Sequence, residues 1–265
     1  MVGAGPHRPG PRPHGLRGTI SPTRRAALLI VPLVGLAALA TACGAQSDGD
    51  AAGHKPSVTG SGTLTAKRSA ADRELLEAAR SGDTGGVRGA IERGADLETR
   101  DESRRTPLLL AAAGDHVRSA EILVDAGADP DALDHQHDTP WLVTGVTGSA
   151  AMARTLAAAG PDYTVVNRYG GTSLIPAGEH GHVAYVREVT TNPDIDVDVN
   201  HVNDLGWTAL LEAVILGDGG EDHQETVKLL LAAGADPAVA DKTGTTALQH
   251  AQQRGFDEIA RLLGR

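Results

Sequence analysis

The sequence is poor in the residues that form cross-links, aromatic clusters and catalytic centres. Cys43 is the only cysteine among 265 residues, so no intrachain disulfide can form and the fold depends on packing. The only aromatic side chains are two tryptophans, three tyrosines and one phenylalanine. The G-x-S-x-G motif of serine hydrolases and the phosphate loop ending in G-K-[ST] are both missing. We therefore expect neither a catalytic site nor a cofactor.

Basic residues are scarce beyond the first 42 positions. Residues 1–42 contain five of the 24 Lys and Arg and none of the 34 Asp and Glu. The remainder carries 19 basic and 34 acidic side chains, a net charge of −15. Binding to nucleic acid requires a basic face, and anionic lipid repels an acidic chain. We therefore expect no nucleic-acid partner.

The first 42 residues have the pattern of an export signal. Residues 1–25 contain five arginines and no acidic residue, and residues 26–42 are uncharged and apolar. That apolar run suits the core of a signal peptide and is short for a membrane span. The sequence Leu39-Ala40-Thr41-Ala42 before Cys43 resembles a bacterial lipoprotein signal, in which cleavage leaves the cysteine as a lipidated N-terminus.

We therefore predict a signal peptide over residues 1–42, lipidation at Cys43, and a flexible tether over residues 43–70. Alternatives are an ordinary signal peptide followed by a cysteine by chance, and an uncleaved membrane anchor. Arg24-Arg25 also leaves export by the twin-arginine route open beside the general route. Each alternative places the rest of the chain outside the cytoplasm, and lipidation would hold it at the outer face of the cell membrane.

One tripeptide, Thr106-Pro107-Leu108, recurs along the rest of the chain at steps of 33, 33, 36 and 38 residues. The later copies are Thr139-Pro140-Trp141, Thr172-Ser173-Leu174, Thr208-Ala209-Leu210 and Thr246-Ala247-Leu248. An Asp or Asn stands five residues before each threonine: Asp101, Asp134, Asn167, Asn203 and Asp241. A 33-residue period with a T-P-L start resembles the ankyrin repeat family.

Each copy also has the local signals of two short helices. Thr106 can cap the first helix through its hydroxyl, and Pro107 suits the first helical position. Gly127 can end the second helix in a left-handed conformation. Pro176 in the third copy removes one hydrogen bond from the first helical turn. Neither helix can bury its apolar stripe alone, so each copy must stack on the next.

The resemblance implies an all-α ankyrin repeat solenoid over residues 71–265, with helix pairs and β-hairpin fingers. We divide it into about six repeats with atypical ends: 72–100, 101–133, 134–166, 167–202, 203–240 and 241–265. The third repeat gains three residues between Pro193 and Asn203, where Ile195, Val197 and Val199 alternate with polar residues as in a strand. The fourth gains five residues, within 216–224, between its two helices.

One motif resembles a site of covalent chemistry. Asp241-Lys242-Thr243-Gly244-Thr245 matches the phosphorylation motif of P-type ATPases, in which the aspartate accepts the phosphoryl group. Those pumps need many membrane spans and a nucleotide-binding domain, and the sequence contains neither. The same five residues hold the finger positions before Thr246, so we assign them to the repeat.

Two clusters have the residue types of metal sites. Asp194, Asp196 and Asp198 alternate like the start of an EF-hand loop, but Val199 and Leu205 replace its glycine and its final glutamate. His135 and His137, flanked by Asp134 and Asp138, could bind a transition metal weakly, although a firm site needs further ligands. We therefore predict no metal site.

The remaining candidate site is the concave face that ankyrin arrays form from their fingertips and first helices. Trp207 and Tyr169 are scarce aromatic residues at finger positions that are variable in the family, which favours a contact role. The alternative is that both side chains pack one finger against the next. The predicted partner-binding residues are Trp207, Tyr169, Arg105, Arg168, Leu205, His135, Asp138 and Lys242.

Two functions fit this interpretation. The first is a membrane-tethered extracytoplasmic module, monomeric, that binds an unidentified exported or membrane protein through its concave face. The second is a small-ligand or metal-binding lipoprotein with an unrecognised activity. Specificity in either case depends on the variable surface residues, which do not name the partner.

Overall fold

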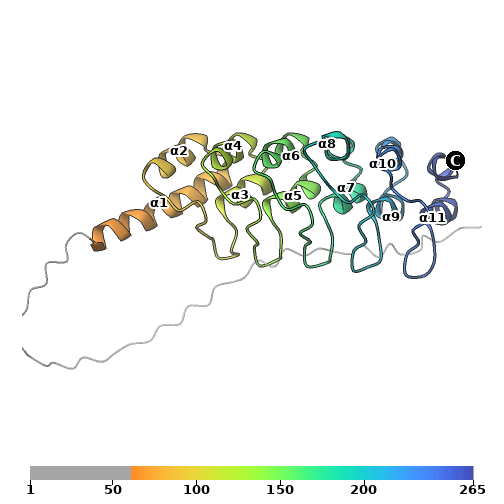
Figure 1. Ribbon diagram of the computed structural model, residues 1–265, viewed down its shortest axis with the longest axis horizontal. Helices are drawn as coiled ribbons and strands as arrows, with labels where there is room; N and C mark the ends of the chain where they lie inside the picture. The colour runs from red at the N-terminus through yellow and green to blue at the C-terminus, as the bar shows by residue number, and fades with distance from the viewer. Residues whose placement is uncertain (1–60, 265) are drawn as a thin grey trace, which may run out of the picture. The chain divides into compact units, whose positions relative to one another are not determined.

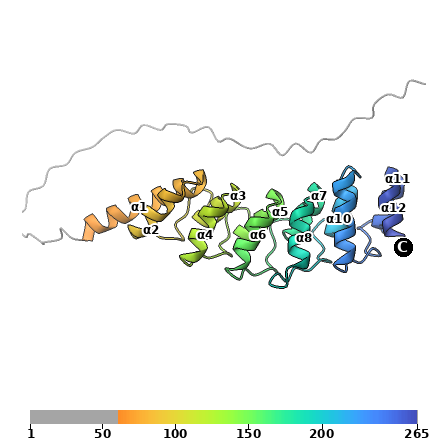
Figure 2. The ribbon, with the colours of Figure 1, turned by 90° about the horizontal axis from the view of Figure 1, so that it is seen from above.

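The computed structural model describes residues 61–264, with side chains from residue 69 onwards, as a row of paired α-helices. The helices are α1 (Ser61–Ser81), α2 (Thr84–Glu92), α3 (Pro107–Ala113), α4 (Val117–Asp125), α5 (Pro140–Thr147), α6 (Ala150–Ala157), α7 (Leu174–His180), α8 (Val183–Thr191), α9 (Ala209–Ile215), α10 (Glu221–Ala232), α11 (Ala247–Arg254) and α12 (Asp257–Leu263). Figure 1 shows the odd-numbered helices α3 to α11 in one row, the even-numbered helices in a second row, and loops projecting from the side of the odd-numbered row. Figure 2 shows the pairs in chain order along the array. The six pairs confirm the predicted all-α solenoid.

The recurring threonines cap the first helices in four repeats. The hydroxyl oxygens of Thr106, Thr139, Thr208 and Thr246 accept hydrogen bonds from the amides three residues later, at 3.3, 3.1, 3.2 and 3.4 Å. Each bond satisfies an amide that lacks a partner within the helix. The capping predicted from Thr106 is therefore confirmed and extends along the array.

The third repeat departs from this pattern because of Pro176. In the other repeats the amide four residues after the threonine donates to the threonine carbonyl, for example from Leu110 to Thr106 at 2.9 Å. Proline has no amide proton, so that bond is missing and α7 begins one residue later, at Leu174. The hydroxyl of Thr172 is buried and has no hydrogen-bond partner in the described residues. The predicted loss of one first-turn bond is confirmed.

The core runs continuously between the two rows of helices. Trp141 and Tyr185 are the largest fully buried side chains, so Trp141 occupies a core position as the register of the repeat indicates. The hydroxyls of Thr144 and Tyr185 share a hydrogen bond of 2.8 Å. A Cβ atom on Gly145 would lie 1.7 Å from the carbonyl oxygen of Ser173, so α5 and the third repeat touch backbone to backbone.

The loops between repeats differ from the predicted β-hairpins. In the residues that the structure describes, no strand forms, and the only β-bridge joins Ala240 to Thr246. Each finger closes over five residues with one backbone hydrogen bond across its base, such as Asp101 N to Arg105 O at 3.1 Å. A single bond is too short a ladder for a strand, so the β-hairpin prediction is corrected to tight turns.

The two insertions lie where the lengthened steps place them. Ile195 is buried and Val197 and Val199 are half-buried against the core, while the alternating aspartates face solvent. The alternation therefore separates buried from exposed side chains, although this segment forms turns and no strand. In the fourth repeat, five residues separate α9 from α10, and α10 extends to 12 residues.

Helix α1 extends beyond the expected boundary at residue 71 towards the N-terminus. Helix α1 begins at Ser61, so residues 61–70, which we assigned to the tether, are helical. The stretch from Thr63 to Ala71 contains no Gly or Pro and includes three alanines, Leu64, Lys67 and Arg68, which favour helix. A helix stabilised by packing around Leu75 can therefore extend towards the N-terminus.

No helix in the described part of the chain has both the length and the apolar character needed to cross a membrane. The predicted signal peptide at residues 1–42, Cys43, and tether residues 43–60 lie outside the described residues.

Candidate functional site

The five fingers and the C-terminal ends of the first helices form one surface, which we call the finger face. The fingers are residues 101–105, 134–138, 167–171, 203–207 and 241–245. In Figure 1 they project in the same direction from the row that contains α3, α5, α7, α9 and α11. Every residue predicted to bind a partner lies on one of these fingers.

The first residue of each finger, here called the anchor, closes the turn with its side chain. The anchors are Asp101, Asp134, Asn167, Asn203 and Asp241. In every case the Oδ1 atom accepts hydrogen bonds from the backbone amides two and four residues later, over 2.6–3.1 Å. This explains why Asp or Asn recurs five residues before each threonine, because both side chains offer an acceptor oxygen in a turn.

In three anchors, the second polar atom of the side chain contacts a neighbouring side chain. The Oδ2 atom of Asp101 lies 3.1 Å from Arg80 and 2.8 Å from Arg105, and that of Asp241 lies 2.8 Å from the ring of His250. The amide nitrogen of Asn203 donates to Glu212 at 3.0 Å. Finger closure and packing against the helices are therefore carried by the same residue.

These contacts shift the titration of the carboxyl groups. Burial tends to raise the pKa of Asp101, but hydrogen bonds from Arg105 and the charge of that side chain bring it below its usual value. Hydrogen bonds from Thr243, Thr245 and His250 lower the pKa of Asp241, the largest effect being the Thr243 hydroxyl. Burial raises the pKa of Glu212 to about 7, aided by the charge of Glu179 on α7 and opposed by the bond from Asn203.

Six large apolar side chains of the described residues are exposed; four belong to fingers or to the C-terminal ends of first helices, and the other two, Leu133 and Val202, immediately precede the second and fourth fingers. Tyr169 and Leu205, both predicted contact residues, are 56% and 54% exposed. Val146 at the end of α5 and Leu216 after α9 are 55% and 47% exposed, and the sequence interpretation missed both. Large apolar groups left in water cost free energy unless another surface covers them.

Two of the predicted contact residues, Arg168 and Tyr169, contact each other, and a third, Trp207, is half-buried. The guanidinium of Arg168 lies 4.6 Å from the centre of the Tyr169 ring and donates to its hydroxyl at 2.8 Å. This contact orients the ring of Tyr169. Trp207 is half-buried and packs against the core cluster, as the alternative of finger packing describes. Tyr169 is therefore the more accessible aromatic side chain.

Of the other predicted residues, His135 and Lys242 link neighbouring fingers, and Asp138 is half-buried. The backbone amide of His135 donates to Ser103 in the first finger at 3.1 Å, and Lys242 donates to the carbonyl of Asp204 in the fourth. Burial raises the pKa of Asp138 to about 6, with Asp134 raising it further and Arg168 lowering it. These contacts connect the first finger to the second and the fourth finger to the fifth.

The histidines near the second helices serve structure. The Nε2 atoms of His116, His182 and His223 lie 3.0, 3.0 and 2.9 Å from carbonyl oxygens of the preceding repeat. These bonds tie adjacent repeats together. Among the residues that the structure describes, no group of three or more His, Cys, Asp and Glu side chains is arranged to hold a metal ion.

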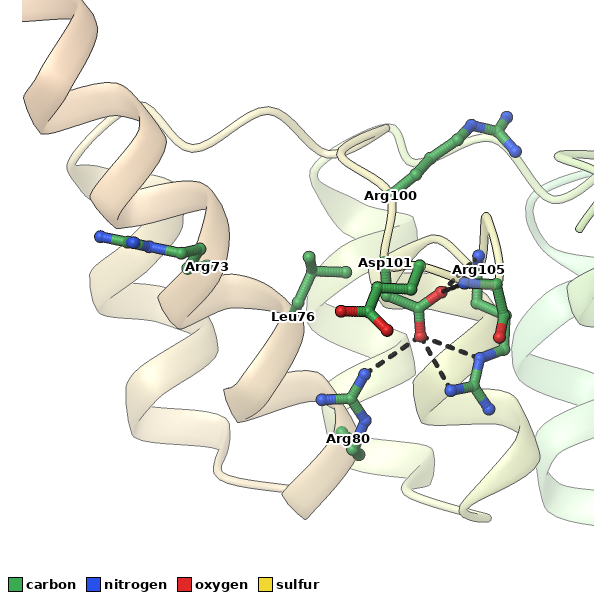
Figure 3. A pocket seen from close by; sticks show the side chains of 8 residues that line it. Arg73, Leu76, Arg80, Arg100, Asp101 and Arg105 are labelled. Atoms are coloured by element: carbon green, nitrogen blue, oxygen red, sulfur yellow. Dashed lines mark hydrogen bonds and ion pairs between the residues drawn. The ribbon is translucent and has the colours of Figure 1, made fainter. Parts of the chain in front are cut away.

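A cavity of about 590 Å³ lies between α1 and the first finger (Figure 3). It is lined by Arg73, Leu76, Arg80, Arg100, Asp101, Glu102, Ser103 and Arg105. Figure 3 shows the carboxylate of Asp101 between the guanidiniums of Arg80 and Arg105. The cavity opens at the N-terminal end of the finger face.

Comparison with known proteins agrees with this architecture. The family profile "Ankyrin repeats (3 copies)" matches residues 146–241 and 174–264, and "Ankyrin repeat" matches residues 103–135. The ankyrin repeat protein YahD of Escherichia coli is 49% identical over 82 residues, which are 31% of this chain and 40% of YahD. The chain thus spans less than half of that relative.

Solved structures extend the likeness over the array. An ankyrin repeat domain from Acinetobacter baumannii is 45% identical, with a TM-score of 0.67, over 71% of this chain and 95% of that domain. The ankyrin repeat protein EF0377 is 36% identical, with a TM-score of 0.69, over 73% of this chain and 98% of that protein. Repeat period, helix pairing and sequence identity agree, and the chain belongs to the ankyrin repeat family.

Proposed function

We propose that this protein is a membrane-tethered, extracytoplasmic module that binds a partner protein through its finger face. Ankyrin repeats typically act as non-catalytic scaffolds for protein–protein interaction. The observation that carries the proposal is the set of exposed apolar side chains, Tyr169 and Leu205 on the third and fourth fingers and Val146 and Leu216 at the C-terminal ends of α5 and α9. An exposed aromatic residue among rigid backbone turns is typical of the residues that contribute most of the binding free energy at an interface.

The finger face is also stiff enough to serve as a binding surface. Anchor side chains close all five fingers, and the finger of Asn167 contacts the next through a bond from the Asp204 amide to the Tyr169 carbonyl at 3.0 Å. A surface that is already ordered loses less conformational entropy when a partner binds. This supports recognition by a preformed surface.

The membrane part of the proposal depends on the N-terminal pattern. The arginine-containing start, the apolar run over residues 26–42 and the small residues before Cys43 are the features that support export and lipidation. Lipidation of Cys43 would hold the array at the outer face of the cell membrane. The partner is then an exported or membrane protein.

In-cell cross-linking followed by partner identification tests the binding function. Wild-type protein should cross-link to a defined partner, and Tyr169→Ala should reduce its capture about tenfold, because a hot-spot truncation costs roughly 1–2 kcal/mol or more. Arg88→Ala on α2, away from the finger face, is the matched control and should capture normally. Equal capture by wild type and a Tyr169→Ala/Leu205→Ala variant would remove the finger face as the binding surface.

A separate experiment tests the tether. Wild-type protein grown with an alkyne fatty acid should become labelled and fractionate with membranes, whereas Cys43→Ser should do neither. Labelling that persists in Cys43→Ser, or an unlabelled wild type, would refute lipidation at Cys43 and leave the binding proposal standing.

A further inference from the structure

The cavity beside the first finger concentrates positive charge in an acidic protein. Its lining contains four arginines and two acidic residues, a net charge of +2 that falls to +1 when Glu77, the ion-pair partner of Arg80 on α1, is included, whereas the chain as a whole carries −10. No comparable arginine group occurs at the other fingers, whose variable positions hold neutral, aromatic or acidic side chains together with Arg168 and Lys242. The finger face therefore has a basic N-terminal end and an apolar middle.

The arginines come from two elements that the fold holds in fixed positions. Arg73, Leu76 and Arg80 follow one another at steps of three and four residues, so they share one face of α1. Arg105 comes from the first finger, and Arg100 precedes it, donating to the carbonyls of Arg104 at 3.0 Å and Leu133 at 2.5 Å. Packing of α1 against the first finger therefore sets the distance between the arginines on α1 and those at the finger.

The anchor of the first finger braces two of these guanidiniums. The Oδ2 atom of Asp101, whose side chain is only 10% exposed, accepts from Arg80 and from Arg105, and Arg80 also donates to Glu77 on α1 at 3.2 Å. A guanidinium has five N–H donors, and these bonds use only some of them. The remaining donors are held next to the open cavity with little rotamer freedom to lose on binding.

Arg73 supplies a charge that the protein itself does not neutralise. Among the described residues it has no hydrogen-bond or ion-pair partner, and its side chain is exposed. Leu76 adds an apolar wall between Arg73 and Arg80, and Figure 3 shows the guanidinium of Arg73 directed away from Asp101. Guanidiniums beside an apolar wall suit a glutamate side chain, which presents methylene groups and a carboxylate together.

Resting on the proposed function, we propose that this cavity binds carboxylate side chains of an acidic segment of the partner protein, while the apolar middle of the finger face binds an apolar part of it. The cavity already holds one carboxylate, that of Asp101, between two guanidiniums. The first and third fingers are two repeat steps apart, roughly 20 Å at 8–10 Å per helix contact. An extended segment spans that distance with about six residues.

The test is binding of a fluorescein-labelled, N-acetylated tetraglutamate peptide to the full-length protein, measured by fluorescence anisotropy at low salt. The wild type should bind with one-to-one stoichiometry, and Arg73→Glu should weaken binding about tenfold, the loss of one charge-assisted contact. Arg73→Gln should give a smaller loss. Arg88→Glu, the same charge change at an exposed site on α2, is the matched control and should bind as the wild type does.

Three results would overturn the proposal. The wild type could fail to bind the peptide; Arg73→Glu and Arg88→Glu could weaken it equally, which would show general electrostatic attraction; or inorganic phosphate could displace it as readily as glutamate does, which would show a general anion site. Circular dichroism of the variants checks that exposed substitutions leave the helices intact.

The partner capture experiment separates this proposal from the proposed function. If the peptide does not bind but Tyr169-dependent capture persists, the cavity proposal fails alone. If the peptide binds at Arg73 and no partner is captured, the carboxylate site stands and the proposed binding function fails. If both hold, Arg73→Glu should also weaken capture.

Discussion

The first and fourth fingers have the same turn and opposite electrostatic surroundings. Asp101 and Asn203 each accept two backbone amides through Oδ1, and the closing bonds are alike at 2.9 and 3.0 Å. The second atom of Asp101 faces two arginines, whereas that of Asn203 faces the buried carboxylate of Glu212. The turn requires only an acceptor oxygen, so the neighbouring side chain decides between Asp and Asn.

The largest expected effect comes from removing the fourth anchor. Asn203→Ala deletes two turn bonds and leaves Glu212 buried without a donor, so we expect a loss of about 3 kcal/mol of unfolding free energy in urea titration. Asn167→Ala is the matched control, because its Oδ1 closes the third finger in the same way and no buried carboxylate depends on it. Equal losses in both variants would mean that the Glu212 contact contributes nothing.

Exchanging the anchor type at the fourth finger should be nearly as damaging at high pH. Asn203→Asp keeps the acceptor but places a second carboxylate beside Glu212, which should cost about 2 kcal/mol at pH 8. At pH 5 the two carboxyls can share a proton, and the cost should largely disappear. The double variant Asn203→Asp/Glu212→Gln restores a donor to the pair and should recover stability at pH 8; failure to do so would contradict the charge explanation.

The pH dependence of the wild type tests the same site without changing the anchor. Glu212 has a pKa of about 7 in the folded chain and an ordinary value of 4.5, so the folded state holds the extra proton between these values. Its contribution is therefore fully present below pH 4.5 and is lost as the pH rises through 7. Between pH 5 and pH 8 we expect a loss of about 1.5 kcal/mol, after allowance for solvent screening.

Glu212→Gln should remove most of this slope in urea titrations at the two pH values. A smaller slope of the same sign should remain from Asp138, whose pKa is raised to about 6. An unchanged slope in Glu212→Gln would assign the pH dependence to other groups.

The smallest effect is expected at the first finger. Asp101→Asn retains the turn and breaks the ion pairs with Arg80 and Arg105, whose side chains are partly exposed. Screened pairs of this kind contribute little, and we expect a loss of about 1 kcal/mol that shrinks in high salt. A loss larger than that of Asn203→Ala would reverse the order on which the comparison of the two fingers depends.

The repeat period and the caps were predictable because they depend on local chemistry. Thr106 followed by Pro107 specifies a helix start within four residues, and Pro176 specifies the missing bond in the third repeat. The prediction of β-hairpin fingers was wrong because a strand needs several ladder hydrogen bonds between the anchor and the threonine. Five residues leave room for one.

The finger face was predicted only in part. Tyr169 and Leu205 stood out as apolar residues at variable finger positions, whereas Val146 and Leu216 were missed because they lie at the C-terminal ends of α5 and α9 among apolar neighbours. Their places seven and eight residues after Thr139 and Thr208 were the available signal. The contact between Asn203 and Glu212 could also be read from the sequence, because the same nine-residue spacing separates Asp241 from His250, which are likewise in contact.

The anchors have a consequence for how such a protein can change. Each one accepts hydrogen bonds from the backbone amides two and four residues later, which any residue except proline can donate, and among the five described fingers only in the first and fifth do the side chains of Arg105 and Thr243 add bonds to the anchor. A fingertip can therefore acquire new residues while the geometry beneath it stays constant. This separates the evolution of specificity from the maintenance of the scaffold, and it makes each finger an exchangeable cassette into which a chosen recognition sequence can be grafted.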